Sequence, residues 1–154
     1  MNMTRLVRCA AVICLLHCTS MFVGAADSKP LKLLYLGDNG HHQPRARFGQ
    51  LQPVLKARGI GLEYTDVVGD LNAEKLAKFD GLVLFANIDK IEDDQAKALL
   101  AYVASGKGFI PLHCASYCFR NNDEIVALMG AQFHRHGTGT FRVATTDAGN
   151  SHPL

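Results

Sequence analysis

Short apolar runs alternate with longer amphipathic stretches along the chain from residue 30 onward. The short runs have little polar content, which is typical of parallel strands buried on both faces, and the longer stretches carry apolar residues at helical spacing. We therefore predict an α/β fold with a doubly wound, mostly parallel sheet. The predicted strands are Leu31–Leu36, Gly61–Thr65, Leu82–Ala86, Gly108–Leu112 and Gly139–Thr145, and the predicted helices are Phe48–Arg58, Ala73–Lys78, Asp93–Ser105 and Asp123–Met129.

Residues that start, stop or bend helices fall at the predicted boundaries. Asn72 can cap the second helix, and Gly59 and Gly106 end the first and third. Pro53 lies inside the first helix, which we expect it to kink or divide because proline lacks a backbone N–H. The stretch after the fifth strand, 147–154, has the composition of a loop with no closing helix. We therefore expect the domain, residues 30–154, to be the N-terminal part of a longer one.

The first residues, 1–26, have the three parts of a secretory signal peptide. Two arginines precede an apolar stretch from Cys9 to Val23, and small residues surround a cleavage point after Ala25 or Ala26. A membrane anchor is the alternative, but polar residues interrupt the apolar run, which is shorter than the roughly 20 residues of a spanning helix. We expect an exported protein, periplasmic or extracellular, with no stable membrane span after processing.

Composition excludes two classes of protein. Three of the five cysteines lie in the predicted signal, so the mature chain keeps Cys114 and Cys118 and is not a small disulfide-stapled domain. The formal net charge of the whole chain is +2, and two of its arginines leave with the signal. A basic surface for nucleic acid is therefore not expected.

Polar side chains gather where the predicted strands end, which is where ligands bind in open α/β sheets. Five of the seven histidines fall in such loops. A neutral imidazole can ligate zinc or exchange protons near neutral pH, although single loop histidines are also common as solvated residues or helix caps. The candidate catalytic residues are His41, His113, His134 and Cys114, the candidate substrate-binding residues are Asp38, Asn39, His42, Asn87 and Arg45, and the hypothetical zinc ligands are His41, His113 and His134.

Cys114 directly follows His113 where a strand turns into a helix, a place where nucleophile elbows occur. A helix N-terminus and a neighbouring histidine can lower the pKa of such a thiol. The glycines that flank an elbow are missing, however, and the alternative is a buried cysteine or a disulfide with Cys118.

Four ordered motifs resemble the ThuA-like (trehalose-utilisation) domain family: 36–42, 79–84, 102–115 and 129–134. The resemblance covers residues 31–154 and implies the flavodoxin-type sheet of the class I glutamine amidotransferase superfamily, without the catalytic triad of those enzymes. It also implies a role in sugar metabolism, with trehalose or keto-glycosides as substrates, and His41 or His42, His113 and His134 as the family's histidine positions. Pro111 departs from the family, which usually has a small residue there, and the family domain normally continues past His152 with further strands.

Three hypotheses follow. The leading one is an exported carbohydrate-metabolism protein, a hydrolase or isomerase, whose histidine-lined site acts on a small sugar and is metal-assisted in one version. The second is a noncatalytic sugar-binding or scaffolding domain of a larger exported protein. The third is a cysteine-dependent hydrolase or amidase. The first depends on imidazoles from three separate turns meeting at one rim of the sheet.

Overall fold

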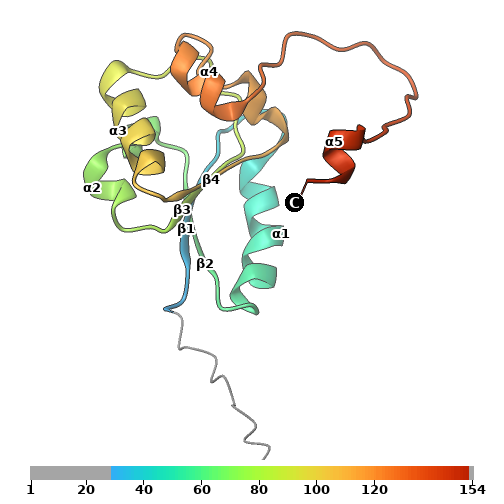
Figure 1. The fold of residues 1–154 in the computed structure, drawn as a ribbon. Helices are drawn as coiled ribbons and strands as arrows, with labels where there is room; N and C mark the ends of the chain where they lie inside the picture. The colour runs from blue at the N-terminus through green and yellow to red at the C-terminus, as the bar shows by residue number, and fades with distance from the viewer. Residues whose placement is uncertain (1–28, 153–154) are drawn as a thin grey trace, which may run out of the picture.

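The computed structural model describes residues 29–152, so the predicted signal peptide, 1–26, lies outside the described residues. A parallel sheet forms the centre of the domain, in the strand order β2-β1-β3-β4 (Figure 1). The first four predicted strands are confirmed, with ends shifted by up to two residues, and so is the α/β class. The strands are β1 (Lys32–Leu36), β2 (Gly61–Thr65), β3 (Gly81–Leu84) and β4 (Gly108–Pro111).

Alternate residues of the central strands face opposite layers of the domain. Leu34 and Leu36 point into the larger core, which packs beneath α2 (Ala73–Leu76) and α3 (Asp93–Ala104). Tyr35, between them, joins Val83 in a smaller core on the other face. Both faces are thus apolar, which explains the continuous apolar runs of the sequence.

Helix α1 (Pro44–Lys56) covers the second face with Phe48, Leu51 and Leu55. It begins four residues earlier than predicted, because Pro44 starts the helix, and it continues through Pro53. Of the two effects expected of Pro53, a kink or a division, the division is wrong. One missing hydrogen bond near the last turn leaves the helix continuous, since packing on the sheet stabilises it.

Two predicted helix boundaries are confirmed in detail. The side chain of Asn72 accepts a hydrogen bond from the backbone N–H of Lys75 at 2.9 Å and so caps α2. Gly106 follows α3 with a φ of 89°, a conformation that favours glycine. The fourth predicted helix is confirmed as α4 (Asp123–Met129), which is followed by an arc of chain (Figure 1).

The predicted fifth strand, Gly139–Thr145, is wrong. Every residue from 131 to 152 is exposed, and Phe141 and Val143, two apolar residues of the predicted strand, are 83% and 80% exposed. This segment pairs with no strand of the described sheet, and a strand without a partner has no stability. The expected loop after it contains one short helix, α5 (Asp147–Asn150), capped by the Thr146 side chain.

Two further features of the fold concern its exterior. Ile110 on the outer strand β4, which pairs with Val83, is 41% exposed, and Leu112 just after it is 37% exposed, so α1 does not fully cover this side of the sheet. Between residues 29 and 152, no helix has the length and apolar character needed to cross a membrane.

Candidate functional site

The loop that carries His41 and His42 is held close to the end of β1. Gly37 donates its N–H to the Thr65 carbonyl at 2.9 Å, and a Cβ at this position would lie 2.7 Å from both Pro44 and the Tyr64 hydroxyl. Only glycine fits such a close approach. The chain therefore turns sharply after β1 and places its two histidines at the carboxyl rim of the sheet.

His113 lies in the turn from β4 into a short 3-10 helix, η2 (His113–Tyr117). Its φ of 49° is in the left-handed region, which is strained for a residue with a side chain. Leu112 just before it is extended and donates its N–H to the Leu84 carbonyl at 2.9 Å, so Pro111 does not disturb the register before the turn. His113, rather than Cys114, thus occupies the strained elbow position.

Three imidazole rings meet at this rim. The ring centroids of His41 and His42 are 4.0 Å apart, and those of His42 and His113 are 4.7 Å apart in an edge-to-face arrangement. Phe85, which follows β3, packs against His113 with a centroid distance of 6.0 Å. The structure therefore brings together the histidines of the first and fourth strand ends across the strand between them.

The surroundings of His42 lower its pKa from the ordinary value of 6.5. Burial is the main cause, and the neighbouring His41 and His113 rings add to it, while the Asp38 carboxylate opposes it. The His42 ring is therefore neutral at neutral pH. Such a ring can accept a proton from a bound ligand.

Asp38 fixes the geometry of the rim through its carboxylate. One oxygen accepts a hydrogen bond from the Gly40 N–H at 2.7 Å, and the other accepts one from the Asn87 N–H. The loop after β1 is thereby joined to the loop after β3. Asp38, predicted to bind substrate, has a structural role in this arrangement.

A cavity of about 520 Å³ opens beside the three imidazoles. It contains the predicted residues Asn87 and Cys114 together with side chains from η2 and from the segment after α4. Its volume lies within the range of roughly 300–1,000 Å³ of small-molecule sites. The lining residues are His41, His42, Asn87, His113, Cys114, Ser116, Tyr117, Phe133 and His136.

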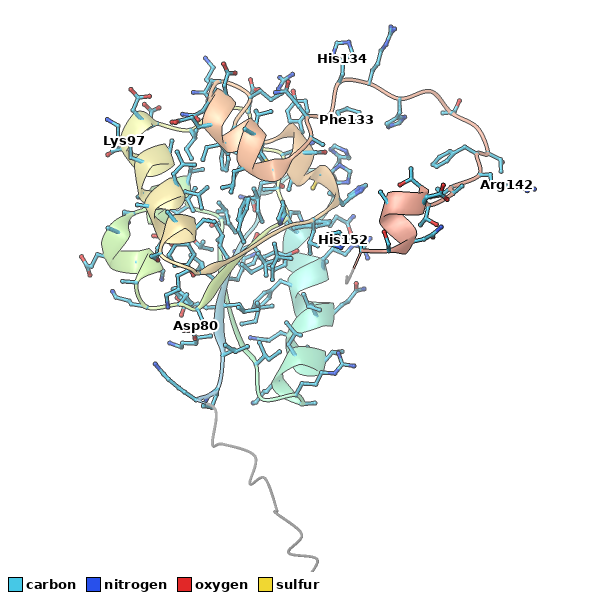
Figure 2. The ribbon with its side chains drawn as sticks, viewed as in Figure 1. Asp80, Lys97, Phe133, His134, Arg142 and His152 are labelled. Atoms are coloured by element: carbon cyan, nitrogen blue, oxygen red, sulfur yellow. The ribbon has the colours of Figure 1, made fainter. Side chains whose placement is uncertain are left out.

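His134 is not brought to this cavity. Figure 2 shows its side chain directed away from the domain, at the top of the view. His136 lines the cavity instead, with its ring centroid 5.6 Å from that of Phe133. Within the described part of the chain, no three histidine, cysteine, aspartate or glutamate side chains are grouped as a metal site.

Arg45 and Asn39 lie on the β2 side of the rim. Arg45 forms an ion pair with Asp66 at 3.2 Å and stacks over the Tyr64 ring at 4.2 Å, and the Asn39 amide also contacts Asp66. Both border a second hollow, of about 490 Å³, which the three imidazoles do not line. The structure thus separates these two predicted substrate-binding residues from the histidines.

Cys114 and Cys118 are free, buried thiols. Burial, with the nearby Asp38 charge, raises the pKa of Cys114 to about 11, and burial raises the pKa of Cys118 to about 12. The Cys118 thiol donates a hydrogen bond to the Ala86 carbonyl at 3.0 Å. The alternatives for these cysteines were an activated nucleophile, a disulfide and a buried thiol, and the structure has the buried thiol. The raised pKa of Cys114 is the opposite of the lowered pKa that activates a nucleophilic thiol.

The candidate site drawn from the sequence leaves out four residues of the cavity, although one of them, His136, is among the five histidines expected in strand-end loops. Ser116 and Tyr117 lie three and four positions after His113, a spacing that places them on the same side of a helical turn. Phe133 and His136 belong to a segment without regular structure, where no periodicity fixes the direction of a side chain. The first pair was therefore predictable, and the second was not.

Comparison with known proteins agrees with this fold. Two crystal structures of ThuA-like proteins are similar: one from Bacteroides uniformis (TM-score 0.51, 18% identity) and one from Parabacteroides merdae (TM-score 0.53, 21% identity). Each match covers 62% of this chain, which spans 41% and 37% of those two proteins. No curated protein matches. The family model described as ThuA, trehalose utilisation, matches residues 32–154, so the chain belongs to the ThuA family.

Proposed function

We propose that the cavity beside His42 and His113 binds a small sugar of the trehalose or keto-glycoside type and moves a proton next to its carbonyl or glycosidic carbon. The observation that carries this proposal is the contact between the two rings, whose centroids are 4.7 Å apart and which both line the cavity. The name of the family supplies the sugar class, and the imidazoles supply the chemistry.

The two rings suit different parts of such a transfer. His42, with its lowered pKa, is neutral at neutral pH and can accept a proton. His113 is exposed at the elbow and can present its ring nitrogen to a sugar hydroxyl or carbonyl. Asn87, tied to Asp38 through its backbone, offers a side-chain amide for the hydroxyl groups.

A zinc ion is the cofactor that the sequence predicts, with His41, His113 and His134 as ligands. The described geometry does not fit that set, because His41 and His113 line the cavity, whereas the His134 side chain is directed away from the domain (Figure 2). The proposed proton transfer therefore contains no step through a metal. Zinc titration of the wild-type protein and of the His134→Ala variant checks the predicted ligand set: loss of stoichiometric binding in that variant would support it.

Exchange of carbon-bound hydrogen in D₂O tests the proton transfer without knowledge of the product. A keto-glycoside incubated with the protein should lose the NMR signal of the hydrogen next to its carbonyl faster than in buffer alone. His42→Gln and His113→Gln should each abolish this exchange, and His134→Gln, whose ring lies outside the cavity, should retain it.

The outcome also separates this function from the second hypothesis. Saturable sugar binding without exchange would indicate a noncatalytic sugar-binding domain. If the protein shows neither sugar binding nor hydrogen exchange, the proposal is overturned.

We also propose that the chain is exported, on the basis of its first residues, 1–26. Expression of the full sequence in a Gram-negative host, followed by N-terminal sequencing of the periplasmic fraction, should give a chain cut after Ala25 or Ala26. An uncut chain retained with the cells would contradict export.

A further inference from the structure

The cavity has a second group of rings besides the imidazoles. Tyr117 and Phe133 both line it, with ring centroids 6.5 Å apart and an angle of 50° between their planes. His136 extends this group, edge to face with Phe133. One part of the cavity is therefore aromatic, while the residues around His113 and Asn87 are polar.

Tyr117 is held in place by Arg120. The guanidinium lies over the Tyr117 ring at 4.1 Å and also donates a hydrogen bond to the phenol oxygen at 2.9 Å. Arg120 is itself fixed by an ion pair with Asp89 at 2.7 Å, in the loop after β3. The ring is thus preorganised before any ligand arrives, which lowers the entropy lost on binding.

Phe133 is positioned by its backbone. Its N–H donates to the Ser116 carbonyl at 2.8 Å, which fastens the segment after α4 to η2. The side chain nevertheless stays 37% exposed. The ring is large, apolar and partly open to water. Covering it with an apolar surface of a ligand therefore lowers the free energy of the complex.

A pyranose ring has the matching chemistry. Its two faces carry C–H groups and are apolar, whereas its rim carries hydroxyl groups. We propose that Phe133 and Tyr117 form a stacking wall for the apolar face of a pyranose, whose rim hydroxyls then reach Asn87 and His113. This inference rests on the proposed function and deepens it, because it names the residues that would bind the apolar face of the sugar ring.

The chain contains no tryptophan, which makes a clean reporter available. In a Phe133→Trp variant, titration with methyl α-D-glucopyranoside or trehalose should shift the emission of the single indole in a saturable way. Sorbitol, an acyclic polyol with the same kind of hydroxyl groups, should give no saturable shift because it lacks a ring face.

Affinity measurements on alanine variants give a second readout. Phe133→Ala and Tyr117→Ala should each weaken trehalose binding about fivefold to tenfold, as expected for the loss of one aromatic contact. Tyr117→Phe keeps the ring and should remain within about twofold of the wild type. Phe141→Ala, at a ring that is 83% exposed and outside the cavity, is the matched control and should change nothing.

The possible results separate this inference from the function on which it rests. If trehalose binds and His113→Gln weakens the binding while both alanine variants equal the wild type, the stacking wall is overturned and the proposed function stands. An aromatic effect without any effect of His42→Gln or His113→Gln supports the stacking wall, but it overturns both the contact of the sugar hydroxyls with His113 and the proposed function. If no pyranose binds the wild-type protein, both are overturned.

Discussion

The ring of His42 meets the ring of His113 edge to face at 4.7 Å, although β1 and β4, which position them, are not neighbours in the sheet. Strand β3 lies between them, and Phe85 at its end contacts both rings. The contact therefore depends on three loops at once. Substitutions in each loop can therefore distinguish residues that stabilise the rim from residues whose rings act on a ligand.

The lowered pKa of His42 links the stability of the fold to pH. The folded protein binds a proton at His42 less readily than the unfolded chain, so this ring opposes folding once it begins to protonate. Its penalty is absent above the ordinary pKa of 6.5 and grows as the pH falls below that value. The urea midpoint of the wild type should fall between pH 7.5 and pH 5 more than that of His42→Gln. If the urea midpoints of the wild type and of His42→Gln fall in parallel with pH, the lowered pKa of His42 is contradicted.

Removal of the Asp38 charge should loosen the rim. In Asp38→Asn, one of the two backbone N–H groups that donate to the carboxylate loses its partner, so the free energy of unfolding should fall by about 1–3 kcal/mol. Asp66→Asn is the matched control, because Asp66 pairs with the exposed Arg45 and its loss should cost about 0.5 kcal/mol or less. Equal urea midpoints for the two variants would show that Asp38 does not join the two loops.

The strained backbone at His113 predicts an unusual order of stabilities. Because its φ is 49°, His113→Gly should be more stable than His113→Ala by about 1 kcal/mol, the reverse of the order in ordinary helices. At Ala115 in the same turn, glycine should instead destabilise the fold by about 1 kcal/mol. Urea denaturation of the three variants measures both differences. A His113→Ala variant at least as stable as His113→Gly would show that the elbow is not strained.

Cys114 should react slowly with alkylating reagents. Its pKa of about 11, compared with 9.0 for an ordinary thiol, leaves about a hundredfold less thiolate at neutral pH. Mass spectrometry after iodoacetamide treatment should show slow labelling in buffer and fast labelling in urea. Rapid labelling of the native protein, together with loss of the D₂O exchange, would favour the cysteine-dependent hydrolase over the histidine site.

The sequence predicted the sheet well because its central strands are apolar on both faces, a pattern that few other arrangements satisfy. It failed at 139–145, where Phe141 and Val143 alternate as in a strand but remain exposed. Pairing is a long-range property that a local pattern does not contain. The same holds for the histidines. The positions of His41, His42 and His113 were predictable because each follows the end of a strand. The side-chain directions of His134 and His136 were not, because they lie in a segment without periodic structure.

The exposed Ile110 and Leu112 have a practical consequence for anyone who purifies this chain. They form an exposed apolar surface beside the outer strand β4, and such a surface favours self-association at high protein concentration. Light scattering should therefore rise with protein concentration, and an Ile110→Lys change should suppress the rise without touching the imidazoles. Ligand titrations on dilute samples of that variant would measure the sugar site free of self-association.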